Sequence, residues 1–323
     1  MSAPLVAIEN LSIDFATASG DFHALRDISL SFGKRRIVGI VGESGSGKST
    51  LALALLGLLP QNTSRISGRS ALGDEDLLAL DPDAARKLRG TRIAMIFQDP
   101  MTALNPVFTL GTQLVDAQRN RHPDLGRYEL LKRAEAMLAR VGISDPAARL
   151  SAYPHQLSGG MRQRVMIAMA LLCEPDVLIA DEPTTALDVT IEAQIMRLIK
   201  DLHGEFDGTI VFVSHSLGLI SEICDDVAVM YAGKIVESGP TRSLFGQPSH
   251  PYTQALLACE IDPDEEPGER LATIKGRLPD LVNVPKGCIF ADRCPSRFGK
   301  CDEEPPPLAV APDHHAACWL VPA

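Results

Sequence analysis

Nine consecutive residues have the types and the spacing of a loop that binds phosphate. They read Gly42-Glu43-Ser44-Gly45-Ser46-Gly47-Lys48-Ser49-Thr50 and match G-x-x-x-x-G-K-[ST] at every required position. The glycines let successive backbone N–H groups point at phosphate oxygens, Lys48 can reach the β- and γ-phosphates, and the Ser49 hydroxyl can bind Mg²⁺. A glycine-rich turn that matches by chance is the alternative. The loop alone therefore indicates a nucleotide site without establishing one.

Further polar residues follow apolar segments that read as buried strands. Residues 177–180 are apolar and lead into Asp181 and Glu182. Because buried carboxylates are costly without a cation or a hydrogen-bonding partner, this pair suggests a metal ligand and a base. Gln98 and His215 follow the apolar segments 92–97 and 209–213, and we expect them at the same sheet edge as Lys48. A lone histidine at a strand end is more often structural than catalytic.

The elements that would position these residues alternate between strands and helices. Residues 36–41 and 51–56 predict a buried strand and a helix on either side of the glycine loop. Residues 5–32 alternate apolar and polar side chains, which predicts antiparallel strands that lead into the central sheet. Phe15 is a candidate to stack on an adenine ring; Phe22 is a rival, and an ordinary core aromatic is the alternative.

The middle of the chain loses the strand pattern. Residues 107–156 predict helices, most clearly over 128–141, as in a helical subdomain inserted into the sheet domain. Ser158 is a good N-cap, and Gly159 and Gly160 leave backbone N–H groups open to an anion at the start of the helix that contains residues 165–173. Residues 185–188, Thr-Ala-Leu-Asp, lead into a predicted helix over 191–203.

Composition narrows the class of protein. The chain has 323 residues, 45% of them hydrophobic, which predicts one large domain and a smaller appendage. A net charge of −10 disfavours nucleic-acid partners, since such proteins usually carry basic stripes. No export signal is evident, and the longest apolar runs fall short of the roughly 18 residues of a membrane span, so we expect a soluble or peripheral protein. Seven cysteines without an export signal suggest a reducing compartment.

Taken in order, these motifs resemble the ATP-hydrolysing subunit of an ABC transporter over about residues 5–245. The resemblance implies an α/β P-loop ATPase core: a RecA-like sheet domain with an antiparallel β subdomain and a helical subdomain at about 107–160, within a domain covering 1–245. It also implies ATP held by the loop of Lys48, with Ser49 and Asp181 serving Mg²⁺ and Glu182 polarising the attacking water.

The same resemblance assigns roles to the remaining motif residues. His215 would contact the γ-phosphate, and Gln98 would bind Mg²⁺ and sense the membrane partner. Residues 158–160, Ser-Gly-Gly, would cap the γ-phosphate of ATP held by a second ATPase subunit, and Asp188 would lie at the seam between the two. Since Glu182 is present, the site is expected to be competent.

The tail points to a subgroup. Met161, at the fifth signature position, and residues 249–257 and 285–295 resemble dipeptide and oligopeptide importer ATPases, whose C-terminal extension would cover 246–323. This implies two membrane permeases, a second ATPase subunit that is a homologous but different chain, an extracytoplasmic solute-binding protein, and a place on the cytoplasmic face of a bacterial inner membrane. Importers of nickel or other small solutes, a soluble DNA-repair or chromosome ATPase, and a subunit with a dead site are the alternatives.

Four cysteines lie in a proline-rich segment with little apolar content. Cys288, Cys294, Cys301 and Cys318 lack the C-x₂₋₄-C start of structural zinc sites. Their wider spacing suits a [4Fe–4S] cluster, and the resemblance points the same way. Zinc with His314 or His315 as substitute ligands, and free or paired thiols, are the alternatives. The acidic segment 260–270 is interpreted as a solvated linker.

Overall fold

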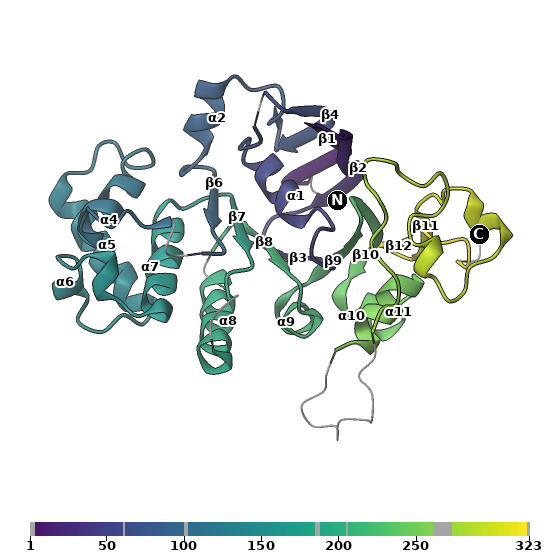
Figure 1. Cartoon of the computed structure of the whole chain (residues 1–323). Helices are drawn as coiled ribbons and strands as arrows, with labels where there is room; N and C mark the ends of the chain where they lie inside the picture. Colours follow the sequence, from purple (N-terminus) through teal and green to yellow (C-terminus); the bar gives the residue numbers. More distant parts are fainter. Residues whose placement is uncertain are drawn as a thin grey trace. The chain divides into compact units, whose positions relative to one another are not determined.

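The chain divides into two compact units in a computed structural model that describes residues 4–60, 62–99, 103–184, 188–204, 206–260 and 273–321. The first unit comprises Met1–Ala79 and Phe212–Ala323, and the second comprises Leu80–Val211 (Figure 1). The tail from residue 246 thus belongs to the same unit as the glycine loop. The predicted domain division at residue 245 stays a prediction.

The first unit contains a small antiparallel sheet with the order β2-β1-β4-β5. A turn at residues 18 and 19 joins β1 (Val6–Thr17) to β2 (Gly20–Phe32), which confirms the predicted antiparallel strands. β4 (Ser64–Leu72) pairs with β1, and β5 (Glu75–Asp76) with β4. These strands form a sheet of their own, in which alternate apolar side chains are buried, and the chain passes from β2 into β3 of the larger sheet.

A second sheet in the first unit supports the glycine loop. β3 (Ile37–Val41), buried at every residue, runs parallel to β9 (Asp226–Tyr231). β9 pairs antiparallel with β10 (Lys234–Pro240), which pairs in turn with β12 (His314–Ala316), and β12 with β11 (Leu308–Ala311). The yellow tail strands therefore continue the sheet that β3 begins (Figure 1).

Short helices surround these strands. In the part of the first unit that the structure describes they are α1 (Lys48–Leu55), α9 (Leu217–Ile223), α10 (Thr241–Gly246), α11 (Pro251–Ala258), and the 3₁₀ turns η2 (Ala291–Arg293) and η3 (Gly299–Asp302).

The second unit pairs two parallel strands, β6 (Ile93–Ile96) and β7 (Val177–Asp181). Between them the described residues contain no strand, as predicted. α4, α5 and α7 pack together around side chains that include Leu114 and Leu138, both 0% exposed. The helices are α2 (Pro82–Leu88), α4 (Leu110–Gln118), α5 (Arg127–Arg140), α6 (Pro146–Arg149), η1 (Pro154–Gln156), α7 (Gly159–Leu172) and α8 (Val189–His203).

One strand, β8 (Thr209–Ser214), contains the boundary between the units. Every residue of β8 is buried. It delivers His215 at its end, as the sequence predicts.

Candidate nucleotide-binding site

The loop between β3 and α1 requires glycine at two positions because other backbone lies against it. A Cβ on Gly42 would stand 2.1 Å from the Met230 carbonyl oxygen. Gly47 has φ +103°, and a Cβ there would stand 2.7 Å from Leu25 Cδ2 and 2.9 Å from the Ala24 carbonyl oxygen. Side chains at either position would push the loop away from β9 and β2, so the glycines fix the path that the sequence predicts.

Lys48 begins α1 and is buried, with 5% of its surface exposed. Its Nζ donates to the Gly42 carbonyl at 2.8 Å and to the Glu43 carbonyl at 3.0 Å. These contacts hold the ammonium group inside the curve of the loop. A phosphate would find its positive charge there, next to the N-terminus of α1. Ser49 follows Lys48 in the first turn of the same helix.

In the second unit, two neighbouring parallel strands bring their polar ends together. β7 ends in Asp181, which is 7% exposed, and Glu182 follows with φ +45°. Gln98 follows β6, and its Nε2 donates to Glu182 Oε2 at 3.0 Å. The predicted meeting of an amide and a carboxylate at one sheet edge is therefore present. Such a pair can orient a water molecule.

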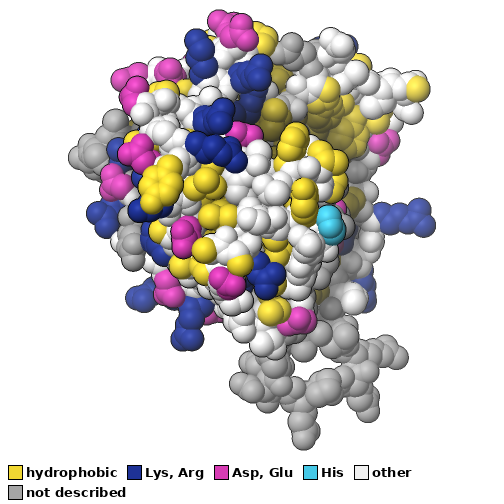
Figure 2. All heavy atoms as spheres, turned by 90° about the vertical axis from the view of Figure 1, so that its left-hand side faces the viewer, with side chains coloured by type: hydrophobic (Ala, Val, Ile, Leu, Met, Phe, Trp, Pro, Cys, Tyr) yellow, Lys and Arg dark blue, Asp and Glu magenta, His cyan; other side chains and the backbone are white. Residues whose placement is uncertain are grey.

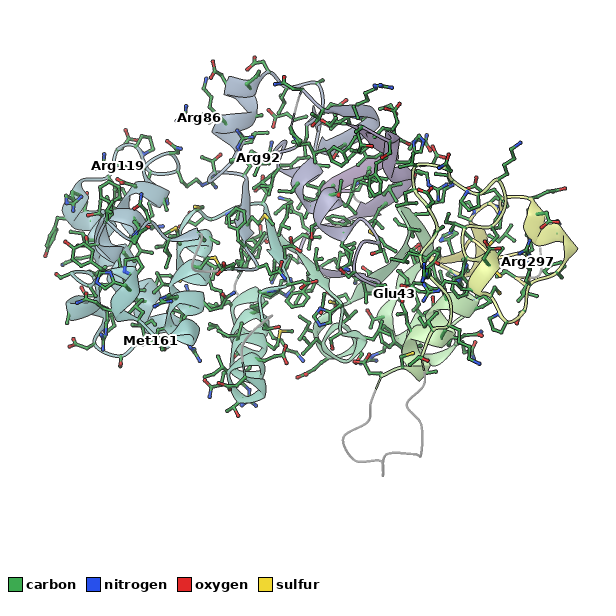
Figure 3. All side chains as sticks on the ribbon, viewed as in Figure 1. Glu43, Arg86, Arg92, Arg119, Met161 and Arg297 are labelled. Atoms are coloured by element: carbon green, nitrogen blue, oxygen red, sulfur yellow. The ribbon has the colours of Figure 1, made fainter. Side chains whose placement is uncertain are left out.

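The Ser-Gly-Gly segment lies at the N-terminus of α7. Ser158 is the N-cap, and its Oγ accepts a hydrogen bond from the Met161 N–H at 3.4 Å (Met161 is labelled in Figure 3). A Cβ on Gly159 would meet nothing within 4 Å, while one on Gly160 would stand 3.0 Å from Ile191 of α8. The helix start is thus open at Gly159 and closely packed at Gly160.

Asp188 caps the neighbouring helix. It is exposed, and its Oδ1 accepts from the Ile191 N–H at 2.9 Å. Because Ile191 also packs against Gly160, the starts of α7 and α8 lie together in the second unit. The preceding residues of the predicted Thr-Ala-Leu-Asp motif, 185–187, lie outside the described residues.

His215 follows β8 in the first unit and is exposed. The helix behind it is held by an unexpected residue. Glu260 accepts from the Gly218 N–H at 2.7 Å and from the Leu217 N–H at 3.3 Å, at the start of α9. A carboxylate at this position satisfies helix N–H groups and opposes the helix dipole. The rest of the predicted linker, 261–270, lies outside the described residues.

Phe15 and Phe22, the two candidates for stacking on adenine, are cross-strand partners in β1 and β2. Both are partly buried. Directly opposed residues of an antiparallel pair point to the same face, so the two rings occupy one surface. The choice between them stays open, as in the sequence.

The predicted site residues are divided between the two units. Residues 42–50, His215 and Phe15 belong to the first, whereas Gln98, Asp181, Glu182, residues 158–160 and Asp188 belong to the second. Each unit assembles its own set. Their convergence on one nucleotide and one Mg²⁺ stays a prediction.

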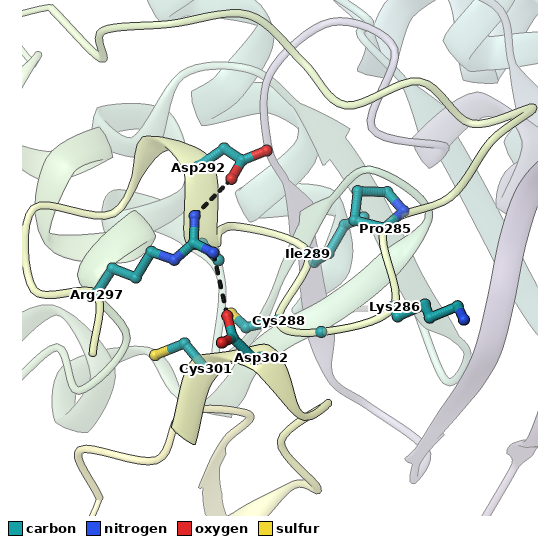
Figure 4. A pocket seen from close by; sticks show the side chains of 10 residues that line it. Pro285, Lys286, Cys288, Ile289, Asp292, Arg297, Cys301 and Asp302 are labelled. Atoms are coloured by element: carbon teal, nitrogen blue, oxygen red, sulfur yellow. Dashed lines mark hydrogen bonds and ion pairs between the residues drawn. The ribbon is translucent and has the colours of Figure 1, made fainter. Parts of the chain in front are cut away.

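The cysteine-rich tail is organised by turns and by hydrogen bonds between its loops. The Cys288 N–H donates to the Cys301 carbonyl at 2.9 Å, and both residues line a pocket of about 270 Å³ (Figure 4). At the rim, Arg297 bridges Asp292 at 2.8 Å and Asp302 at 3.1 Å. Within the described ranges, no group of three or more His, Cys, Asp or Glu side chains is placed to hold a metal ion. The predicted cluster is thus not supported as a ready-made ion site.

His314 is not available as a zinc ligand, which corrects one of the alternatives. Its Nε2 lies 2.9 Å from Glu237 Oε1 and its Nδ1 lies 3.1 Å from the Ser243 hydroxyl, in a setting where the imidazole is 1% exposed. Both ring nitrogens are therefore occupied. Glu237 also accepts from the N–H groups of Ser249, at 2.7 Å, and His250, at 3.0 Å. This buried carboxylate joins β10, β12 and the start of α11.

Two contacts on the glycine loop were not found from the sequence. Arg293 of the tail forms a bidentate ion pair with the Glu43 carboxylate, and the Tyr252 hydroxyl accepts a hydrogen bond from the Glu43 N–H at 2.9 Å. The only available signal was an arginine directly before Cys294. Residues 250 positions apart give no local pattern.

Among the helices that the structure describes, none is long and apolar enough to cross a bilayer. Exposed apolar side chains do occur in the helical part of the second unit, at Val107 (70% exposed), Phe108 (50%) and Tyr128 (69%). Figure 2 views the side that carries α4, α5 and α6, and apolar side chains there lie among charged ones.

Comparisons with known proteins match both parts of the chain. A family described as "ABC transporter" matches residues 25–185, and one described as "Oligopeptide/dipeptide transporter, C-terminal region" matches residues 236–301. A dipeptide transport ATP-binding protein of Bacillus subtilis is 46% identical over 98% of this chain and 94% of its own length. An oligopeptide transport ATP-binding protein of Salmonella typhimurium is 46% identical over 98% and 93%.

Solved structures resemble the fold as well. A dimeric ATP-binding cassette in a post-hydrolysis state with ADP and Pi has a TM-score of 0.66 at 28% identity, covering 73% of this chain and 99% of that chain. A subunit of an ABC transporter complex from Clostridium perfringens has a TM-score of 0.64 at 28% identity, covering 76% and 92%.

Proposed function

This chain belongs to the ABC transporter family as an ATP-binding subunit, and from that premise we propose that it hydrolyses ATP to power the import of dipeptides or oligopeptides. The observation that carries the proposal is the likeness to two peptide transport ATP-binding proteins along nearly the whole chain, tail included. Neither importers of nickel nor ATPases of DNA repair are favoured by these relatives.

The geometry within each unit supports a division of labour in hydrolysis. Lys48 and the loop N–H groups would hold the phosphates, and Ser49, Gln98 and Asp181 would hold Mg²⁺, which would neutralise phosphate charge. Glu182 would polarise the attacking water. The Gln98 amide, which donates to the Glu182 carboxylate, would fix the orientation of that carboxylate. Phosphoryl transfer to water needs positioning and charge neutralisation more than covalent help.

A second ATPase subunit would complete the site. The open space beside Gly159, at the N-terminus of α7, and the packing of Gly160 against α8 suit an anion presented from outside the unit. We propose that residues 158–160 cap the γ-phosphate held by the partner, with Asp188 at the seam, and that His215 contacts the γ-phosphate in its own subunit. ATP would then close the pair and hydrolysis would release it.

Membrane partners follow from the transport role. We propose two permease subunits and an extracytoplasmic solute-binding protein, with this chain on the cytoplasmic face of a bacterial inner membrane. We assign contact with a permease to the helical part of the second unit, where the apolar side chains of Val107, Phe108 and Tyr128 are exposed. Gln98 is exposed at the end of β6 and donates to Glu182, so a shift of Gln98 on permease binding would change the position of the Glu182 carboxylate.

We also propose that the four cysteines of the tail hold a [4Fe–4S] cluster. Burial raises the pKa of Cys288, and the charges of Cys301, Cys318 and Cys294 raise it further, so the four thiols lie in one neighbourhood. A [4Fe–4S] cluster is held by four cysteine thiolates, which is the number of thiols in this neighbourhood. Iron and acid-labile sulfide in anaerobically purified protein would support it; stoichiometric zinc without iron would exclude it.

The test of hydrolysis is Glu182→Gln in the assembled transporter. The variant should still bind ATP but lose at least a hundredfold in turnover, because the amide cannot polarise water as a carboxylate does, and general-base catalysis contributes about 10²–10⁴. Asp201→Asn, an exposed change on α8 in the same unit, is the control and should keep wild-type turnover. Turnover of Glu182→Gln close to wild type would refute the role of Glu182.

The test of the transport role is purification from native membranes in mild detergent. Permease chains that co-purify, together with ATP hydrolysis stimulated by a peptide-loaded binding protein, support a peptide importer. Stimulation by a nickel-loaded binding protein would favour the metal importers instead. Recovery of DNA-repair proteins without permeases would overturn the proposal.

A further inference from the structure

Hydrogen bonds from the tail hold Glu43 of the phosphate loop. The Arg293 guanidinium donates to Glu43 Oε2 at 2.6 Å and to Oε1 at 3.0 Å, while the Tyr252 hydroxyl accepts from the Glu43 N–H at 2.9 Å. In Figure 3 the labelled Glu43 lies beside the ribbon of the tail. Tail residues therefore bind both the side chain and the backbone of Glu43.

Every N–H group of the Arg293 guanidinium donates a hydrogen bond. Besides the pair to Glu43, its Nε donates to the Lys275 carbonyl at 3.0 Å, Nη2 to the Ile274 carbonyl at 3.1 Å and Nη1 to the Tyr231 hydroxyl at 3.3 Å. Its side chain is 5% exposed and that of Glu43 is 28% exposed. A guanidinium has five N–H donors in a rigid fork, so this arrangement uses all of them. A flexible surface ion pair would not be built this way.

Aromatic packing supports Arg293 and Tyr252. Tyr231 of β9 lies against Tyr252 with ring centroids 4.6 Å apart, and Phe290, three residues before Arg293, contacts both rings at 5.2 and 5.3 Å. Gly276 leaves room for the arginine: a Cβ there would stand 3.0 Å from Arg293 Cγ. The tail segment between Cys288 and Cys294 is therefore anchored on the strand next to β3.

The third polar group of Glu43, its backbone carbonyl, connects this anchor to Lys48. Its carbonyl accepts from Lys48 Nζ at 3.0 Å. Glu43 is accordingly held at its N–H by Tyr252, at its carboxylate by Arg293 and at its carbonyl by the lysine that would meet the β- and γ-phosphates. Any change in the position of Glu43 changes the curve of the loop and the place from which Lys48 reaches a nucleotide.

We propose that Arg293 and Tyr252 are positioning residues, through which the cysteine-rich tail presets the phosphate loop and so raises the ATP affinity of the subunit. The inference rests on the proposed role of the loop in binding ATP. Neither residue touches the reacting atoms. Their effect is to order, before binding, a loop that would otherwise lose conformational freedom when ATP arrives.

The experiment compares full-length variants by ATP affinity, measured with a fluorescent ATP analogue, and by steady-state hydrolysis in the assembled transporter. Arg293→Lys keeps the charge but loses the fork. We expect the Kd and the KM for ATP to rise about tenfold while kcat at saturating ATP stays within twofold. Tyr252→Phe, which removes only the acceptor of the Glu43 N–H, should raise Kd about threefold. Arg297→Lys is the matched control, because Arg297 also pairs with two carboxylates in the same tail but is exposed. It should change neither Kd nor KM.

A double-mutant cycle separates positioning from stability. If the pair acts as a unit, Glu43→Gln together with Arg293→Lys raises Kd by less than the product of the single changes. An unfolded fraction would lower kcat and leave KM unchanged, and that result would overturn the inference. So would wild-type affinity in Arg293→Lys while Lys48→Ala abolishes binding. Full binding in Lys48→Ala would instead refute the assigned loop itself.

Discussion

His250 makes the stability of the first unit depend on pH. The side chain is 1% exposed, and burial lowers its pKa from 6.5 to about 4. Its Nδ1 accepts a hydrogen bond from the Tyr252 N–H at 3.0 Å, which only the neutral ring can do. In the unfolded chain the imidazole keeps its ordinary pKa of about 6.5. The unfolded state therefore binds more protons than the folded state between these two values, and acid destabilises the fold.

The size of the effect follows from the two pKa values. At about 1.36 kcal/mol for each pKa unit, the fall from 6.5 to about 4 corresponds to about 3 kcal/mol of unfolding free energy. This contribution is complete above pH 6.5 and is lost as the pH falls toward 4. Between pH 7 and pH 5 the linkage removes about 2 kcal/mol.

The measurement is urea unfolding of the full chain at pH 5, 6 and 7, followed by the fluorescence of Trp319. This is the single tryptophan of the chain, and it lies in the same unit as His250. His250→Asn keeps an acceptor for the Tyr252 N–H and removes the titrating ring. Its unfolding free energy should fall with acid by about 2 kcal/mol less than that of the wild type. Equal pH slopes in the two proteins would refute the reasoning, because a packing defect shifts stability at every pH alike.

Two further predictions concern the loop and the buried carboxylate. Gly47→Ala should weaken ATP binding at least tenfold in an equilibrium binding assay, because a Cβ would meet Leu25 and the Ala24 carbonyl at a φ of +103°; unchanged affinity would contradict the assigned loop path. Glu237→Ala should lower the unfolding free energy by about 3 kcal/mol in urea titrations, since the Ser249 and His250 N–H groups and His314 would lose a buried partner; a loss under about 1 kcal/mol would show that water replaces the carboxylate.

The sequence predicts those parts of the site whose chemistry lies in contiguous residues. The loop around Lys48 follows from glycine spacing, and the meeting of Gln98 with Glu182 follows from two apolar segments that end in polar residues. Parallel strands place their carboxyl ends at one edge, so a local pattern was sufficient. The N-cap Ser158 was predicted from a local pattern as well, whereas Asp188 was predicted only to precede a helix and is found to be its N-cap.

Long-range pairing could not be predicted in this way. His314 was named as a possible substitute zinc ligand, yet Glu237, 77 residues earlier, occupies its Nε2. The contact of Arg293 with Glu43 joins two distant segments. Glu43 occupies a position where the loop motif allows any residue, and the sequence does not indicate which tail residue lies next to the loop. Phe15 and Phe22 illustrate a different limit: they are opposite one another in β1 and β2, so no sequence rule favours either ring.

The pairing of β12 with β10 bears on how the protein is made. β10 is complete at Pro240, but within the described part of the chain the strand that pairs with its outer edge is His314–Ala316, about seventy residues later in synthesis. A nascent chain therefore leaves the ribosome with an open sheet edge and with Glu237 still lacking His314. Removal of the strands β11 and β12 would expose that edge again and leave the buried Glu237 without His314, so we expect a chain truncated before β11 to be less stable than the full chain.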